Sequence, residues 1–348
     1  MQRPLKIGVL IACYNYERYV GAAINSVFAQ TRAADEVIVV DDGSTDRSAA
    51  IVEGWFGDRV KLIRQANAGQ TVALRNGFAQ STADVIQFLD ADDRLLPGAL
   101  AAIERVWRDG TSKAQFDLEV IDGDGQRLGR RFCRFPAGYD AAAAARDFER
   151  TGTYPWPVTS GNAYARSFLT QAIGEPTPVS LDGVLNTLAP LYGTIETIVE
   201  PMGEYRIHGA NKSHEDQGRS FAKPQFARRI DIRRAELALL ADHCIRLDRP
   251  VPLRDPLDHE IAFVNYRMIA HRIHRHRTDS RSPGRFHFWK RGVTLGLRDG
   301  GGIRQRLSHV AWFSALFVAP QRVVGLLIDA RYGRAVIVKQ LGKALRWR

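Results

Sequence analysis

Short apolar runs alternate with helical patterns through roughly the first 110 residues, and this alternation constrains the fold more than any other feature. The apolar runs lie at residues 6–12, 36–40, 60–63 and 85–89. Their shortness and their content of valine and isoleucine are typical of strands buried in a parallel sheet. Each is followed by a segment with apolar residues at helical spacing, at 17–30, 46–56, 71–80 and 97–107. We therefore predict an α/β fold with a mostly parallel central sheet.

The middle and the end of the chain have different patterns. Residues 116–121 and 126–132 flank the sequence Asp122-Gly123-Asp124-Gly125 and predict a hairpin. This acidic turn lacks the later acidic ligand of a 12-residue calcium loop, so a turn is the better interpretation. Helices are predicted at 140–150 and 181–191, and from about residue 224 the pattern is helical and basic.

Acidic residues follow the second and fourth predicted strands. The two runs are Asp41-Asp42-Gly43-Ser44-Thr45-Asp46 and Asp90-Ala91-Asp92-Asp93. Ligands of such sheets bind outside the carboxyl ends of the strands, where the two runs would meet. Clustered carboxylates repel one another unless a cation intervenes, and hard oxygen ligands suit Mg²⁺ or Mn²⁺ bound together with a diphosphate. Ser44 is the expected N-cap of the helix at 46–56.

Several motifs occur in the order and spacing of a known family. Ala12-Cys13-Tyr14-Asn15, the 39–46 run, Asn67-Ala68-Gly69 with 73–76, and Asp90-Ala91-Asp92-Asp93 together resemble family 2 glycosyltransferases of the GT-A fold over about residues 5–110. A fainter resemblance continues through Ser160-Gly161-Asn162, Asp182 and residues 205–208, and stops near residue 220. The expected organisation is a catalytic domain at 1–220 and a basic, mainly helical region at 221–348.

The resemblance implies a role for individual positions in the donor site. Ala12 and Tyr14 would line the nucleotide pocket, and Asp42 would accept a hydrogen bond from the base, usually uracil. Asp90 would lie near the ribose and sugar, and Arg75 near the sugar or the diphosphate. The full implied donor-binding set is Ala12, Tyr14, Asp42, Arg75, Asp90, Asp92 and Arg206.

The metal ligands and the catalytic base are also implied by the resemblance. Asp92 and Asp93 would hold Mg²⁺ or Mn²⁺, with His208 as a third ligand. Which acid of the run binds the metal stays open, because the additional aspartate shifts the register of the motif. Asp182 would be the base that deprotonates the acceptor hydroxyl, with Glu175 as the second candidate and a helix N-cap as the structural alternative for Asp182.

The activity implied is inverting transfer of one hexosyl or N-acetylhexosaminyl group from a nucleotide sugar, most simply a UDP-sugar. The acceptor would be a glycan or a lipid-linked carrier in polysaccharide or lipopolysaccharide synthesis. Processive relatives carry a Gln-x-x-Arg-Trp signature and membrane spans, which this sequence lacks. A sugar nucleotidyltransferase is the first alternative, but it would need a glycine-rich, basic loop after the first strand. A nucleic-acid-binding protein is the second.

The charge of the chain is divided unequally between its two ends. The whole chain carries 49 Lys and Arg against 38 Asp and Glu, a net charge of +11. Residues 221–348 carry 26 basic and 10 acidic residues, a net charge of +16, so residues 1–220 carry −5. A basic surface with interspersed aromatic residues favours an anionic membrane surface over nucleic acid, and a solvated helical bundle is the alternative.

Neither end of the chain predicts a membrane span. The apolar run at 310–328 is interrupted by Pro320 and Arg322, and a central arginine costs about 2.5–3.5 kcal/mol on insertion scales. Residues 7–13 read as a buried strand and not as a signal peptide. The three cysteines are too few for a disulfide framework. We expect a cytoplasmic protein, peripheral at the inner face of the plasma membrane.

Overall fold

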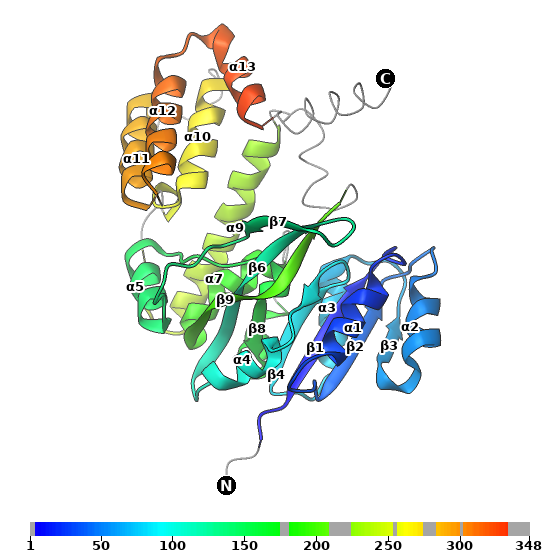
Figure 1. The fold of residues 1–348 in the computed structure, drawn as a ribbon. Helices are drawn as coiled ribbons and strands as arrows, with labels where there is room; N and C mark the ends of the chain where they lie inside the picture. Colours follow the sequence, from blue (N-terminus) through cyan, green and yellow to red (C-terminus); the bar gives the residue numbers. More distant parts are fainter. Residues whose placement is uncertain are drawn as a thin grey trace, which may run out of the picture. The chain divides into compact units, whose positions relative to one another are not determined.

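The structure, a computed structural model, describes residues 4–174, 181–208, 224–252, 256–273, 283–299 and 302–332 (Figure 1). The chain divides into two compact units. The first comprises residues 1–150, 154–207 and 239–250, and the second comprises residues 151–153, 208–238 and 251–348. The helix α9 (Pro224–Arg246) contributes residues to both. The domains 1–220 and 221–348 remain a prediction.

The first unit is built on one nine-stranded sheet, whose strands run in the order β3-β2-β1-β4-β8-β6-β9-β5 with β7 paired to β6. The four strands predicted from the apolar runs form and are parallel neighbours. They are β1 (Ile7–Cys13), β2 (Glu36–Asp41), β3 (Lys61–Arg64) and β4 (Val85–Asp90). The central strand β1 is almost wholly buried, which explains its continuous apolar sequence.

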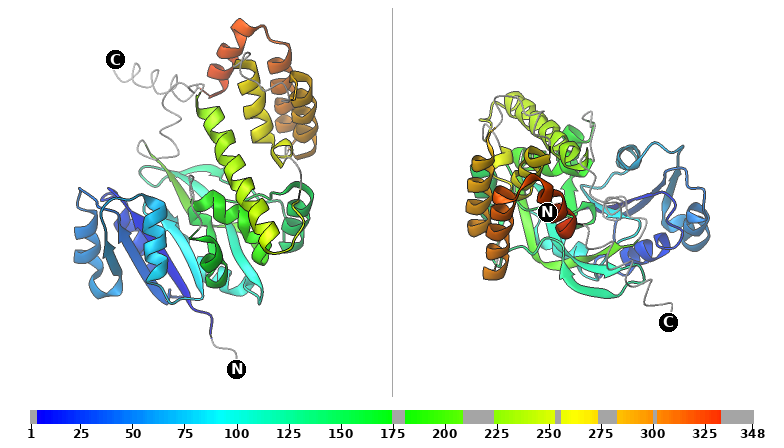
Figure 2. Two further views of the ribbon diagram at one scale, coloured as in Figure 1. Left: turned by 180° about the vertical axis from the view of Figure 1, so that it is seen from behind. Right: turned by 90° about the horizontal axis from the view of Figure 1, so that it is seen from above.

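Helices cover both faces of this parallel part of the sheet. Val9 and Ile11 of β1 share a core cluster with apolar side chains of α1 (Val20–Phe28), α2 (Ser48–Phe56) and α4 (Ala99–Val106). Leu10 points to the other face, where α3 (Gln70–Ala79) packs closely, and a Cβ at Gly77 would lie 2.6 Å from it. Figure 1 has α1 in front of the sheet, and the reverse view in Figure 2 has α3 in front.

The rest of the sheet is mixed. The predicted hairpin is confirmed, since β6 (Thr111–Asp122) and β7 (Arg127–Arg131) pair antiparallel. The strand β8 (Asn162–Ala165) is antiparallel to both β4 and β6, while β9 (Thr194–Ile207) is parallel to β6 and antiparallel to the short β5 (Arg94–Leu95). The helices here are α5 (Ala141–Thr151), α6 (Arg166–Ala172) and α7 (Leu181–Tyr192).

The second unit is helical, as predicted. Beside its part of α9 it contains α10 (Ile261–Ile273), α11 (Arg285–Asp299), α12 (Ile303–Val318) and α13 (Gln321–Tyr332). Its core includes Met268, Phe288, Phe313 and Ile328. The apolar run at 310–328 is broken between α12 and α13, and no helix in the described parts of the chain is both long and apolar enough to cross a bilayer. All three cysteines are free.

Candidate functional site

The carboxyl ends of β2 and β4 lie on either side of the end of β1. In the register of the sheet, Cys13 is opposite Asp41 of β2, and Ala12 is opposite Asp90 of β4. The chain leaves β1 toward β2 on one side and places β4 on the other, which makes the end of β1 a topological switch point. Both acidic runs therefore begin at one edge of the sheet, at the place where doubly wound folds bind their ligands.

The carboxylate of Asp42 is buried and organises the loop before α3. Its Oδ1 accepts hydrogen bonds from Gln65 Nε2 and from the amide of Ala68, both at 2.8 Å, and its Oδ2 accepts one from the amide of Gly69 at 2.8 Å. The next residue, Gly43, has a φ of +76°, and a Cβ there would lie 2.8 Å from the amide nitrogen of Asn67. The 65–69 loop is thus held closely against the end of β2.

The loop after β1 is joined to the loop after β2. The amide of Asn15 donates to Ser44 Oγ at 3.0 Å, Asn15 Oδ1 accepts from the amide of Thr45 at 2.8 Å, and Asn15 adopts a φ of +58°. The N-cap role expected of Ser44 is wrong, because its hydroxyl serves this loop and α2 begins at Ser48. The N-cap position is Arg47, and Asp46, one residue before it, accepts from the amide of Ser48 at 2.9 Å.

Ala12 and Tyr14 flank that junction at the end of β1, and both are half-buried. Tyr16, two residues further on, was not predicted as a site residue. Burial and the carboxylates of Asp92, Asp90 and Asp93 raise the pKa of its phenol. This influence places Tyr16 beside the second acidic run. Sequence periodicity gives no signal for it, because the approach joins loops about 75 residues apart.

The three aspartates of the second run have different surroundings. Asp90 is half-buried, and its Oδ1 accepts from Gln70 Nε2 at 2.6 Å. Asp93 is 1% exposed, and both of its oxygens have donors: Ser160 Oγ at 2.6 Å and the amide of Arg206 at 2.8 Å. Burial, with the charges of Asp92 and Asp90 nearby, raises the pKa of Asp93 well above its ordinary value. Asp93 therefore ties together segments of the fold.

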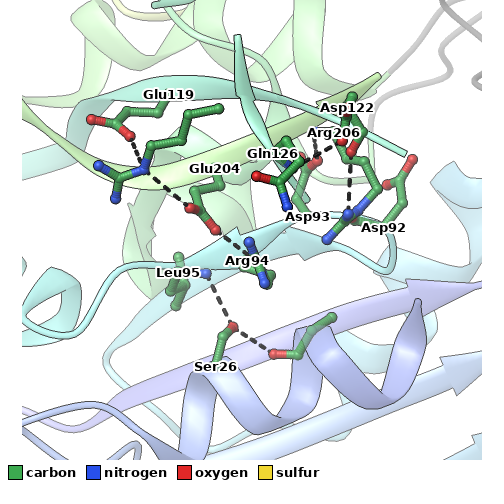
Figure 3. A network of polar contacts seen from close by, with 12 residues as sticks. Ser26, Asp92, Asp93, Arg94, Leu95, Glu119, Asp122, Gln126, Glu204 and Arg206 are labelled. Atoms are coloured by element: carbon green, nitrogen blue, oxygen red, sulfur yellow. Dashed lines mark hydrogen bonds and ion pairs between the residues drawn. The ribbon is translucent and has the colours of Figure 1, made fainter. Parts of the chain in front are cut away.

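Arg206 donates hydrogen bonds to backbone carbonyls, and its expected contact with phosphate stays a prediction. Its Nε donates to the carbonyl of Asp92 at 2.7 Å, and its Nη1 lies 3.3 Å from the carbonyls of Asp122 and Gly123 (Figure 3). The guanidinium also lies 5.0 Å from the ring centre of Tyr19. Burial and the neighbouring Arg94 lower the pKa of Arg206. The side chain fixes the turn of the second acidic run against the β6–β7 hairpin.

A second polar cluster in Figure 3 supports the same region from β9. Glu204 accepts from Arg94 Nε at 2.7 Å, and Arg127 lies 3.9 Å from its other oxygen. Arg127 also pairs with Glu119 at 2.8 Å, so the hairpin, β5 and β9 are linked by charge. These contacts position the backbone around Asp92 and Asp93 through β5, which follows directly after the acidic run.

The predicted set of three metal ligands is not assembled. His208 is half-buried just beyond β9, and no group of three histidine, cysteine or acidic side chains in the described ranges is arranged to hold a metal ion. Asp90 and Asp92 carry hard oxygen ligands of the kind that divalent cations prefer, and the charges of both raise the pKa of Asp93 and of Tyr16. Mg²⁺ commonly takes only one or two protein carboxylates and fills its shell with water and substrate phosphate.

Arg75 and Asp182 lie in other parts of the first unit. Arg75, on α3, donates from Nε to the carbonyl of Ile173 at 2.5 Å, just after α6. Asp182 stands in the first turn of α7, and its Oδ1 accepts from Asn186 Nδ2 at 2.9 Å. Glu175, the second candidate for the base, lies outside the described residues. This bond joins Asp182 to the residue one helical turn further along α7.

Comparison with known sequences points to one family. Residues 8–170 match the model of glycosyl transferase family 2. A protein named as an uncharacterized glycosyltransferase in Nostoc is 38% identical over 216 residues, which cover 60% of this chain and 66% of the relative. The succinoglycan biosynthesis protein ExoO of Rhizobium meliloti is 36% identical over 121 residues, covering 34% of this chain and 35% of the relative. The match covers less than two thirds of either relative.

Solved structures share the fold at low sequence identity. The mannosyltransferase PcManGT from Pyrobaculum calidifontis, in complex with GDP-Man and Mn²⁺, gives a TM-score of 0.53 at 16% identity, over 98% of this chain and 88% of that one. TarS 1–349 of S. aureus, in complex with UDP-GlcNAc, gives 0.51 at 16% identity, over 97% of this chain and 92% of that one. This likeness identifies the GT-A fold.

Proposed function

The chain belongs to glycosyl transferase family 2 through residues 8–170, and from that premise we propose that it transfers one sugar, with inversion, from a nucleotide-sugar donor to an acceptor hydroxyl. One observation supports this proposal above the others. Asp42 follows β2, Asp90 ends β4 and Asp92 follows it, so these acids lie on the two sides of β1 at the switch point of the sheet. A nucleotide bound along the end of β1 would have acidic groups at both ends of its length.

The donor is proposed to be a UDP-sugar. Ala12 and Tyr14 would line the base pocket, and Asp42 would accept a hydrogen bond from the base beside the 65–69 loop that it already holds. UDP-GlcNAc is bound by TarS, which has the same fold. Arg75 would act near the sugar, and the bond from its Nε to the carbonyl of Ile173 would hold its side chain there.

Asp90 and Asp92 are the proposed ligands of Mg²⁺ or Mn²⁺. When bound, such an ion stabilises the negative charge of the departing diphosphate. Asp93 contributes indirectly, because its bonds to Ser160 and to the amide of Arg206 hold the backbone that carries Asp92. Arg206 contributes in the same way through the carbonyl of Asp92.

Asp182 is the proposed catalytic base. The oxygen of the acceptor hydroxyl forms a bond to the anomeric carbon while the bond from that carbon to the diphosphate breaks. The hydroxyl proton passes to the carboxylate of Asp182, and the leaving electron pair stays on the diphosphate. One base is sufficient for a single displacement, so inversion needs no second carboxylate.

The acceptor is proposed to be a glycan or lipid-linked intermediate of a cell-surface polysaccharide or lipopolysaccharide. The relative ExoO carries the name of a succinoglycan biosynthesis protein, and the relative EpsH of Bacillus subtilis, 33% identical over 156 residues, is named as a putative glycosyltransferase. Transfer of a hexosyl or N-acetylhexosaminyl group would suit either kind of acceptor.

Nucleotide binding provides the direct test of this function. We expect a UDP-sugar or UDP to raise the melting temperature of the full chain, and to do so more strongly with Mn²⁺ than with EDTA. A ligand at 100 times its dissociation constant stabilises the folded state by about 2.7 kcal/mol, which a thermal-shift assay detects easily. Matched GDP- and dTDP-sugars measure base preference. If no nucleotide stabilises the chain with either metal, the proposed function is wrong.

The second unit is proposed to contact an anionic membrane surface at the cytoplasmic face. The first two turns of α12 expose Ile303 (76%) and Leu307 (60%), which lie one helical turn apart on one face, and Arg304 and Arg306 are exposed beside them. Apolar side chains that enter the headgroup region, together with basic side chains that face anionic lipid, are what such a surface requires. The net charge of +16 over residues 221–348 supports the same partner.

We expect the full chain to bind vesicles containing phosphatidylglycerol at low salt and to bind neutral phosphatidylcholine vesicles much more weakly. The double substitution Ile303→Asp and Leu307→Asp should weaken binding, because it places acidic groups where apolar contact is needed. Ile245→Asp is the matched control, since Ile245 is 74% exposed but belongs to the first unit. Co-sedimentation measures all three. Equal binding to both kinds of vesicle, or an effect of Ile245→Asp as large as that of the double substitution, would contradict the membrane proposal.

A further inference from the structure

A lysine is completely buried in the middle of the sheet. Lys113 lies in β6 and is 0% exposed, although lysine is almost never fully buried without a partner. Its ammonium donates to Gln115 Oε1 at 2.9 Å, to the hydroxyl of Tyr154 at 3.2 Å and to Asn186 Oδ1. All three donor positions of the ammonium are therefore in use. Neither the family motifs nor the proposed donor site accounts for this charge.

Asn186 connects the lysine to Asp182. Its Oδ1 accepts from Lys113 and also from the hydroxyl of Tyr164 at 3.1 Å, and its Nδ2 donates to Asp182 Oδ1 at 2.9 Å. Two donors on one atom fix the orientation of the amide, because only the oxygen can accept. Asn186 stands one turn after Asp182 on α7, so the helix itself sets the distance between them.

The carboxylate of Asp182 is part of the electrostatic environment of Lys113. Burial lowers the pKa of Lys113 to about 7, and the carboxylate of Asp182 opposes that change. The other titratable groups that face Lys113 are Cys133, Tyr154 on the segment before β8, and Tyr164 on β8. Burial raises the pKa of Cys133 to about 12 and raises that of Tyr164 as well, so both are neutral at pH 7. Among these groups, Asp182 is the one whose charge favours the protonated form of Lys113 most.

We propose that Lys113 is a positioning residue for Asp182: through the amide of Asn186 it fixes the direction of the carboxylate, and its ammonium form favours the ionised carboxylate. This inference rests on the proposed role of Asp182 as the base. A base must be ionised and must point at the hydroxyl before the hydroxyl can lose its proton. A well-packed apolar residue would fill the site at a lower desolvation cost than a lysine. We attribute the desolvation cost of burying Lys113 to its connection with Asp182 through Asn186.

Titration of Asp182 in the full chain tests the inference without any ligand. We would label the aspartates with ¹³C at Cγ and assign the Asp182 resonance by its loss in Asp182→Asn. In Lys113→Met we expect the titration midpoint of Asp182 to rise by about one pH unit or more, because a nearby opposite charge shifts a carboxyl pKa by roughly that amount. The acid limb of the pH profile for nucleoside diphosphate release should move in the same direction.

Tyr164→Phe is the matched control. It removes the other hydrogen bond to Asn186 Oδ1 without changing charge, so the Asp182 midpoint should stay in place. If Lys113→Met does not fold, Asn186→Leu removes the connecting amide and keeps the lysine, and it should also raise the midpoint because Asp182 loses its donor.

An unchanged Asp182 midpoint in Lys113→Met, or in Asn186→Leu if only that variant folds, overturns the inference. An equal rise in Tyr164→Phe overturns it too, since packing alone would then explain the shift. The failure of the proposed base is a separate result, because it would appear as undiminished turnover in Asp182→Asn.

Discussion

Replacing Asp182 by asparagine is expected to lower turnover by about 10²- to 10⁴-fold while nucleotide binding is unchanged. Asparagine has nearly the same shape as aspartate, and its carbonyl oxygen can still accept the hydrogen bond from Asn186 Nδ2. It cannot accept a proton from the acceptor hydroxyl. The substitution therefore removes the proposed chemistry and leaves the local structure in place.

The measurement has two parts. Release of nucleoside diphosphate from the sugar donor found in the thermal-shift panel reports turnover, and calorimetric titration with UDP and Mn²⁺ reports binding. Asp147→Asn on α5 is a suitable control, because Asp147 bonds to Tyr139 and Arg150 away from the cluster of Asp182, and it should leave turnover intact. Normal turnover in Asp182→Asn would mean that the base is another residue.

The second large effect is expected from Asp92→Ala. Stabilisation by UDP with Mn²⁺, about 2.7 kcal/mol at 100 times the dissociation constant in the unaltered chain, should fall to nearly zero, and turnover should be lost. The fold should be retained, since the hydrogen bond from Arg206 Nε is made to the backbone carbonyl of Asp92, which alanine keeps. Thermal shifts with and without metal measure both quantities.

Asp93→Ala is the contrasting variant for this experiment. It removes the acceptor of the Ser160 hydroxyl and of the Arg206 amide, and leaving buried donors without partners costs about 1–3 kcal/mol each. We expect a lower melting temperature without ligand, with a smaller loss of Mn²⁺-dependent stabilisation than in Asp92→Ala. If the two variants show the reverse pattern, Asp93 is the metal ligand and Asp92 the structural residue.

The parallel part of the fold could be predicted because short stretches of the sequence are enough to identify each of its strands and helices. Strands β1 to β4 are short apolar runs, and the helices between them repeat apolar residues at helical spacing. Their boundaries differ from the prediction by only a few residues, mostly where a helix begins. Val20, and not Glu17, begins α1, because residues 15–17 are held by the 44–48 loop.

Ser44 shows where prediction from pattern failed, and Arg206 makes structural contacts that the pattern did not predict. Each has a side chain that commonly binds phosphate or caps a helix, and each contacts backbone groups here. Arg206 donates hydrogen bonds to three backbone carbonyls, one in the turn after β4 and two in the β6–β7 hairpin. The hydroxyl of Ser44 accepts a hydrogen bond from the amide of Asn15. The partners are backbone groups, which nearly every residue type has, so the amino-acid sequence gives little indication of these contacts.

The sequence by itself determined that acidic side chains stand at the carboxyl ends of two parallel strands, β2 and β4, because the alternation of apolar runs and helical patterns locates the strands and gives them one direction. Only the tertiary structure decided how deeply each of those acids is buried and which groups donate hydrogen bonds to it. The partners of Asp93 come 67 and 113 residues later in the chain, and Lys113 meets Asn186 across 73 residues. Burial and hydrogen bonding are set by such distant segments, and they decide whether a carboxylate supports the fold or serves chemistry.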